Sequence, residues 1–316
     1  MRSLPTMRMR WLAVIAAAAP LCSAMAQEYR DYPSVKFPAE ESNQGLNFAA
    51  YYARANELTA QARRSLRTRL DQPFGPNPKQ RLDLYLPKQP VKNAPVVLFI
   101  HGGAFEEGDR AHYGFVAQPF AAQAMVTAIT GYRLTSREPN AGFKYPAQAD
   151  DVKQAVLWLY KHVAEYGGNP HAIFVVGHSA GAILAADVGV DRSWLTRAGV
   201  PEDALRGIVP ISARYDFVNV EPMNPDWAPT PELREQASPL RHIKNAAPFA
   251  LIAYGEKEPQ LAPAARDLNT ALTTAKVSSQ VLVVPGADHA AIALSLNDAT
   301  SPLSQAIQSL IKSARR

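Results

Sequence analysis

The sequence predicts an α/β fold with a mainly parallel central sheet and helices on both of its faces. Short apolar runs alternate with helical patterns from residue 80 onward. Two of the runs, PVVLFI at 95–100 and AIFVV at 172–176, are apolar throughout, which is typical of strands buried on both faces. Strands that alternate with helices form βαβ units, so the strands are expected to be parallel. A chain of 316 residues, 47% of them hydrophobic, can enclose one sizeable core.

The first 26 residues have the pattern of a secretory signal peptide. Three arginines and no acidic residue lie in MRSLPTMRMR, and a short apolar run ending in small residues at Ala24 and Ala26 follows. We therefore expect export to the periplasm or the medium, cleavage near Ala26, and no stable membrane insertion afterwards. An uncleaved anchor is the alternative, but the apolar run is short for a membrane span. Cleavage would remove the only cysteine, Cys22, so no disulfide would stabilise the mature chain.

The charge balance gives no indication of a nucleic-acid partner. The formal net charge of +5 falls to +2 once the three arginines of the signal segment are removed. The sequence has no basic stripe and no basic patch interleaved with aromatic residues. We therefore expect a small-molecule partner, and the sequence leaves the oligomeric state open.

Residues 27–79 come before the alternating region. Residues 27–45 are polar and rich in turn formers, as in an exposed lead-in. From Leu46 to Leu70 apolar residues recur every three or four positions, which predicts an amphipathic helix. Because such a stripe usually faces a core, we expect a packing helix, with a lid over a binding site as the alternative.

Residues 80–316 form the predicted main domain. The expected strands are 80–86, 95–100, 124–129, 172–176, 207–211, 249–254 and 280–284, and the clearest expected helices are 147–163 and 180–190. The stretch 213–247 interrupts this alternation with five prolines, so a small cap insertion and a long loop are both possible there. In parallel sheets ligands bind beyond the carboxyl ends of the strands, and motifs that directly follow a strand are candidates for chemistry.

The motif Gly177-His178-Ser179-Ala180-Gly181 lies between a predicted strand and a predicted helix. A sharp strand-to-helix turn leaves no room for side chains on either side of the serine, which explains the two glycines. Such a turn exposes the serine oxygen at the sheet edge, and the helix start places backbone amides and a positive dipole end beside it. Ser179 is therefore the candidate nucleophile.

A second motif, HGGAF at 101–105, directly follows the buried strand 95–100. Adjacent glycines let backbone N–H groups approach a ligand closely, as an oxyanion hole requires. We assign the donors to the amides of Gly103, Ala104 and Ala180, and the choice between the first two stays open. His101 is expected to orient this loop by hydrogen bonding.

The candidate base is His289, which follows the last predicted strand. A base must lie at the same sheet edge as the nucleophile, and a third residue should fix its tautomer and stabilise its protonated form. Glu258, after the strand 249–254, gives the chain order serine, acid, histidine. Its rivals are Glu256 in the same loop and Asp216 after the preceding strand.

Together these motifs resemble a known family. The resemblance rests on HGGAF, GHSAG, YRL at 132–134, YPAQADD at 145–151 and QRLDLYLP at 80–87. They resemble the bacterial carboxylesterase and arylformamidase-like branch of the α/β hydrolases, and also the hormone-sensitive-lipase relatives, which usually have a glycine at the position of Ala104. The resemblance covers roughly residues 80–315 and implies the α/β-hydrolase fold, with Ser179, Glu258 and His289 as the triad. Glutamate at 258 departs from the commoner aspartate.

The expected function is that of an exported serine carboxylesterase acting on short-acyl or aromatic carboxylic esters. Candidate residues of the substrate pocket are Phe105, Phe115, Tyr215 and Trp227, with plain packing as the alternative for Tyr215. The sequence has no metal-binding signature and no dinucleotide-binding motif, so no cofactor is expected. An arylformamidase acting on N-formylkynurenine and a feruloyl-type esterase are the enzymatic alternatives. A non-catalytic binding protein that keeps the fold is the alternative of another class.

Overall fold

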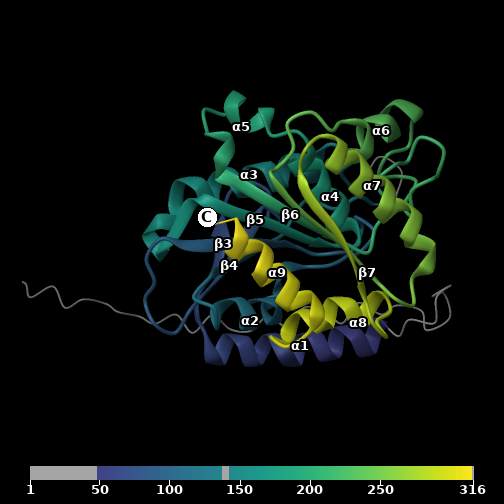
Figure 1. Ribbon diagram of the computed structural model, residues 1–316. Helices are drawn as coiled ribbons and strands as arrows, with labels where there is room; N and C mark the ends of the chain where they lie inside the picture. Colours follow the sequence, from purple (N-terminus) through teal and green to yellow (C-terminus); the bar gives the residue numbers. More distant parts are fainter. Residues whose placement is uncertain (1–47, 137–141, 315–316) are drawn as a thin grey trace, which may run out of the picture. The chain divides into compact units, whose positions relative to one another are not determined.

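An eight-stranded sheet forms the centre of the structure (Figure 1). The structure is a computed structural model that describes residues 48–136 and 142–314. The predicted signal peptide and the lead-in at 27–45 therefore lie outside the described residues. The strands are β1 (Arg67–Pro73), β2 (Arg81–Leu86), β3 (Ala94–Ile100), β4 (Val126–Thr130), β5 (Gly168–His178), β6 (Leu205–Ile211), β7 (Phe249–Gly255) and β8 (Ser278–Val284).

The sheet is mainly parallel, as predicted. Its strand order is β1-β2-β4-β3-β5-β6-β7-β8. β4, β3 and the four strands after them pair in parallel, whereas β2 pairs antiparallel with both β1 and β4. All seven residues of β3 are buried, in agreement with the continuous apolar run in its sequence.

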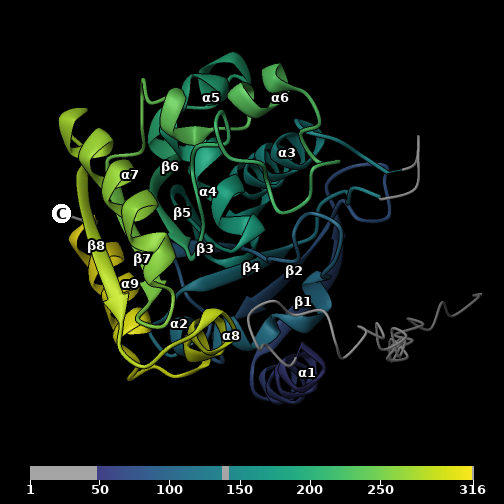
Figure 2. The ribbon, with the colours of Figure 1, turned by 90° about the vertical axis from the view of Figure 1, so that its right-hand side faces the viewer.

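Helices cover both faces of the sheet (Figure 2). The α-helices are α1 (Phe48–Ser65), α2 (Ala117–Ala121), α3 (Ala147–His162), α4 (Ala180–Val190), α5 (Ser193–Arg197), α6 (Pro231–Gln236), α7 (Ala262–Thr274), α8 (His289–Leu294) and α9 (Pro302–Ser313). Buried side chains of α3, α4 and α7 form one core with the sheet, and those of α1, α2, α8 and α9 form the other. None of the helices within 48–136 and 142–314 is long and apolar enough to cross a membrane.

Helix α1 is shorter than the sequence pattern predicts. The predicted helix runs to Leu70, but α1 ends at Ser65 and the next residues form strand β1. Pairing with β2 satisfies the backbone groups of these residues, and this tertiary contact overrides the helical pattern. The apolar stripe of α1 is buried against the segment 110–116, so α1 is a packing helix.

The stretch 213–247 is a long loop that contains the short helix α6. Its larger apolar side chains, Phe217 and Trp227, belong to the same core as α3 and α4. Because these side chains are buried in the main core, this stretch does not form a separate cap with a core of its own.

The carboxyl ends of five parallel strands bring distant segments to one edge of the sheet. Ile100 at the end of β3 is in register with Gly177 of β5, and His178 is in register with Ile211 of β6. At the same edge, Gly255 of β7 is in register with Val284 of β8. The segments that follow these five strands contain the HGGAF loop, Ser179, the stretch 213–247, Glu258 and His289.

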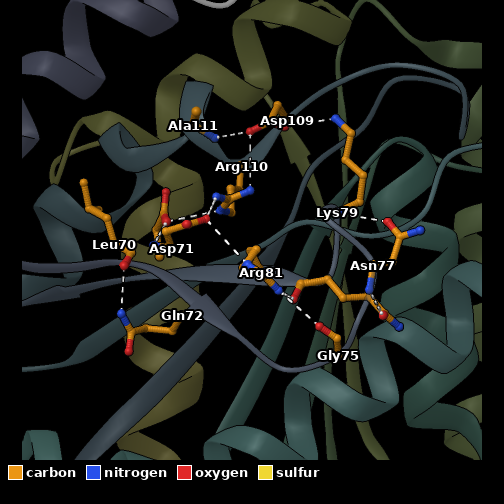
Figure 3. Close-up of polar contacts among 12 residues, drawn as sticks. Leu70, Asp71, Gln72, Gly75, Asn77, Lys79, Arg81, Asp109, Arg110 and Ala111 are labelled. Atoms are coloured by element: carbon orange, nitrogen blue, oxygen red, sulfur yellow. Dashed lines mark hydrogen bonds and ion pairs between the residues drawn. The ribbon is translucent and has the colours of Figure 1, made fainter. Parts of the chain in front are cut away.

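A network of charged residues ties the antiparallel end of the sheet to the segment after the HGGAF loop (Figure 3). Arg110 forms ion pairs with Asp71 of β1 and, at 3.2 Å, with the buried Asp83 of β2. Lys79 pairs with Asp109 at 3.0 Å, and the Asp109 carboxylate accepts a hydrogen bond from the amide of Ala111. The segment 109–111 is therefore tied to β1 and β2 through the Arg110 side chain, and to Lys79 through Asp109.

We expect Arg110→Met to destabilise the protein by about 3 kcal/mol, because it leaves the Asp83 carboxylate buried without its main partner. The measurement is the midpoint of urea unfolding. The matched control is Arg54→Met, which removes an ion pair to Glu57 whose two side chains are more than half exposed. That variant should change the free energy of unfolding by less than about 1 kcal/mol. Equal effects of the two substitutions would contradict the structural role of Arg110.

Candidate active site

Ser179 occupies a strained turn between β5 and α4. Its backbone angles are φ 56° and ψ −121°, which a residue with a side chain rarely adopts. Its amide donates a hydrogen bond to the carbonyl of Ile211 at 2.9 Å, which fixes the turn to the end of β6. The turn thus holds the serine at the carboxyl edge of the sheet, as the GHSAG motif predicts.

The two glycines of the motif are required by close backbone approach. A Cβ atom on Gly177 would lie 2.0 Å from the carbonyl oxygen of Gly181. A Cβ atom on Gly181 would lie 2.2 Å from the carbonyl oxygen of Ile100, at the end of β3. The start of α4 therefore lies directly against β3, and no side chain fits at either position.

The HGGAF loop lies beside the serine. A Cβ atom on Gly102 would lie 2.9 Å from the Cβ of Ser179. Gly103 and Ala104 both have positive φ angles, 116° and 48°. Within the described ranges, no residue accepts a hydrogen bond from the amides of Gly103, Ala104 or Ala180. These three amides are available to bind an oxyanion, which is the role predicted for them.

His101 holds this loop through a hydrogen bond and ring contacts. It is buried, and its Nδ1 donates a hydrogen bond to the carbonyl of Gly102 at 2.7 Å. The rings of Tyr132 and Tyr113 stack on its two sides. Burial lowers the pKa of His101 to about 4, so the ring is neutral at pH 7. These contacts agree with an orienting role for His101.

The structure brings the predicted acid and base into contact. His289 is the first residue of α8, and the Asp288 carboxylate caps that helix by accepting hydrogen bonds from the amides of Ala290 and Ala291. The Nδ1 of His289 donates a hydrogen bond to Glu258 Oε1 at 2.7 Å. This contact leaves Nε2 as the ring nitrogen that would have to act as the base.

The second carboxylate oxygen of Glu258 is also satisfied. Its Oε2 accepts hydrogen bonds from the Ser212 hydroxyl at 2.6 Å and from the Gly255 amide at 3.0 Å. Burial alone would raise the pKa of the Glu258 carboxyl, but the hydrogen bond and charge of His289 and these two donors outweigh it. The pKa therefore lies below its ordinary value, and Glu258 is ionised at neutral pH.

The two rival acids lie elsewhere. The carboxylate of Glu256 is exposed and accepts a hydrogen bond from the Gly286 amide at 2.7 Å. Asp216 forms an ion pair with Arg241 at 2.7 Å. The contact with His289 therefore favours Glu258 as the acid.

Two residues at this edge make contacts that the sequence motifs do not predict. Ser212 directly follows β6 and donates to Glu258, but a single serine after a strand has no distinguishing pattern. His178 donates from Nε2 to the carbonyl of His289 at 2.9 Å, so it fixes the backbone of the base to the serine turn. Burial and the nearby charge of His289 lower the pKa of His178 to about 3, which keeps the ring neutral.

The four candidate pocket residues separate into two groups. Phe105, Tyr215 and Trp227 belong to the core that includes Ala180 of the serine turn. Phe115 is fully buried in the core on the other face of the sheet, and its amide donates to Thr59 of α1. Phe115 packs with α1 and not with the other three residues, so these contacts lend no support to its predicted place in the pocket.

The described part of the chain shows no arrangement suited to a metal ion. Within residues 48–136 and 142–314, no group of three or more histidine, cysteine, aspartate or glutamate residues is placed to hold one. The acid and base residues that contact each other at the sheet edge are Glu258 and His289.

Comparison with known proteins shows related sequences among esterases. The model of the family BD-FAE matches residues 82–198. The protein named Esterase LipC of Mycobacterium tuberculosis (strain ATCC 25618 / H37Rv) is 32% identical over 207 residues, which cover 58% of this chain and 50% of LipC. Kynurenine formamidase of Danio rerio is 24% identical over 261 residues, 80% of this chain and 85% of the formamidase. The chain spans about half the length of the first curated relatives it matches.

Solved esterase structures share the fold. Esterase B from Lactobacillus rhamnosis, inhibited by a tributyrin phosphonate, superposes with a TM-score of 0.68 at 18% identity and covers 84% of this chain and 92% of that one. The carboxylesterase EstE1 from a metagenomic library gives a TM-score of 0.62 at 20% identity over 84% and 93% of the two chains. The α/β-hydrolase fold expected from the sequence is thereby confirmed.

We expect Glu258→Gln to slow the labelling of Ser179 by a fluorophosphonate probe by at least about 100-fold, because the amide cannot stabilise a protonated His289. The measurement is the second-order rate constant of labelling. Glu256→Gln is the control and should label nearly as fast as the wild type. Rapid labelling of Glu258→Gln together with slow labelling of Glu256→Gln or Asp216→Asn would assign the acid to another residue.

Proposed function

We propose that the chain is an exported serine carboxylesterase of the α/β-hydrolase superfamily that hydrolyses short-acyl or aromatic carboxylic esters. The hydrogen bond between Glu258 and His289, at the same sheet edge as Ser179, is the observation that most supports this proposal. Two further features support it: the strained turn would present Ser179 as the nucleophile, and the amides of Gly103, Ala104 and Ala180 would form the oxyanion site.

The reaction would begin when Ser179 Oγ attacks the ester carbonyl carbon and His289 Nε2 takes the hydroxyl proton. The negative charge that develops on the carbonyl oxygen would be stabilised by the amides of Gly103, Ala104 and Ala180. Glu258 would stabilise the protonated imidazole through Nδ1. His289 would then give its proton to the leaving alcohol, which leaves the acyl group on Ser179.

Water would complete the cycle. His289, neutral again, would take a proton from a water molecule, and the hydroxide would attack the acyl carbon. The bond to Ser179 Oγ would break as His289 returns the proton to the serine, and the carboxylic acid would leave. Neither half of this proposed reaction requires a cofactor.

An arylformamidase is the second candidate function. The kynurenine formamidases of Danio rerio and Salmo salar are among the relatives of this chain. The same triad and oxyanion amides would cleave a formamide by the same steps. A feruloyl-type esterase is a further candidate among the ester hydrolases. Turnover of p-nitrophenyl esters, feruloyl esters and N-formylkynurenine by one preparation would distinguish the three.

We expect the wild type to hydrolyse p-nitrophenyl butyrate and Ser179→Ala to lose at least about 1000-fold in kcat, since nucleophile, base and acid act as a unit. The release of p-nitrophenol measures this. Addition of a chelator is the control and should leave the wild-type rate unchanged. Near-normal turnover by Ser179→Ala would contradict the proposal, as would a wild type that binds esters without cleaving them.

Export is part of the proposal and rests on the basic and apolar pattern of residues 1–26. Expression of the full chain in a bacterial host with a periplasm should give a protein whose N-terminal residue is Gln27. Mass spectrometry of the periplasmic fraction and the medium would detect this end. Uncleaved protein that stays in the cytosol would contradict it.

A further inference from the structure

Two aromatic rings from distant segments stack on each other, and one of them belongs to the residue that follows Ala104, a candidate oxyanion donor. Phe105 follows Ala104 in the chain, and its ring stacks on that of Trp227 with the centroids 3.8 Å apart and the planes at 9°. The rings of Tyr145 and Phe217 pack edge-on against Trp227, each at 5.6 Å. Trp227 is fully buried, and Phe105 is 3% exposed. Four aromatic side chains are therefore packed together at the residue that follows Ala104.

The backbone holds both partners of the stack in place. The carbonyl of Phe105 accepts a hydrogen bond from the Thr135 amide at 2.8 Å, and that of Trp227 accepts one from the Tyr145 amide at 2.9 Å. In the described part of the chain, Trp227 Nε1 has no hydrogen-bond partner. The indole is therefore held by packing, and its contribution at this place is the volume it occupies.

The position of the stack identifies the part of the substrate that it would meet. The base must reach the leaving oxygen, so the alcohol part of an ester lies toward His289, which follows β8. The sheet order places β8 on one side of β5 and β4 on the other. The carbonyl of Phe105 is hydrogen-bonded to the amide of Thr135, in the segment after β4. The stack therefore lies on the β4 side of β5, away from His289. The acyl part of the substrate would then extend to this side.

We propose that Trp227, stacked on Phe105, closes the acyl pocket and restricts the acyl group to short chains. This inference rests on the proposed esterase function and deepens it, because it assigns the length limit to one side chain of the stretch 213–247. It also places any aromatic group of the substrate on the alcohol side, where the stack does not intrude.

The test compares p-nitrophenyl butyrate with p-nitrophenyl octanoate in the wild type, Trp227→Ala and Trp227→Phe. The measured quantity is the ratio of kcat/KM for octanoate to that for butyrate. Each additional buried methylene is worth about a fourfold gain, so room for two of them should raise the ratio about 15-fold in Trp227→Ala. Trp227→Phe removes less volume and should raise it about fourfold. Within one variant the ratio does not depend on the folded fraction.

Phe115→Leu is the matched control. It also truncates a fully buried aromatic side chain, but in the core on the other face of the sheet, and its ratio should equal that of the wild type. An unchanged ratio in both Trp227 variants would overturn the inference while wild-type turnover left the esterase proposal intact. An equal rise in Phe115→Leu would also overturn it, since general loosening would then explain the effect.

A second substrate series tests the assignment to the acyl side. In alkyl butyrates the acyl group is constant and the alcohol lengthens from ethyl to hexyl. We expect the Trp227 variants to show the wild-type dependence on alcohol length. If the Trp227 variants changed the dependence of kcat/KM on alcohol length but not its dependence on acyl length, the assignment to the acyl side would be contradicted. A wild type that cleaves no ester of either series would remove both this inference and the proposed function.

Discussion

The arrangement of the site depends on the contact between the start of α4 and the end of β3. Gly181 lies so close to the carbonyl of Ile100 that a single added carbon would overlap it. This approach forces the chain to turn sharply at Ser179, and the strained backbone angles follow from the turn. The same approach brings the amide of Ala180 and the HGGAF loop after β3 to one place. One steric constraint between two backbones thus sets the positions of the candidate nucleophile and the oxyanion donors.

The positions of Glu258 and His289 depend on electrostatic constraints. Glu258 is only 3% exposed, and a carboxylate is costly to bury unless its oxygens are bonded. Ser212, the Gly255 amide and His289 supply these bonds and keep the carboxylate charged. The neutral His178 then fixes the backbone of His289 without placing a positive charge next to it. The acid and base are therefore positioned by groups at or just after the carboxyl ends of four strands, β5, β6, β7 and β8.

The sequence predicts the elements whose pattern is local and strong. The apolar run at 95–100, the helix 180–190 and the two glycine motifs correspond closely to β3, α4 and the two turns at the sheet edge. Strand β1 is not predicted, because its half-exposed residues follow a helical pattern and only pairing with β2 makes them a strand. The position of Phe115 and the role of Ser212 depend on tertiary contacts over long sequence separations, which periodicity does not encode.

The central claim is that Ser179 forms an acyl-enzyme during ester hydrolysis. The most direct measurement is to quench the protein with acid during turnover of p-nitrophenyl butyrate and to map its peptides by mass spectrometry. We expect a butyryl group on Ser179 in the wild type, and none on that peptide in Ser179→Ala. A butyryl group on a different residue, or turnover without any acylated peptide, would contradict it.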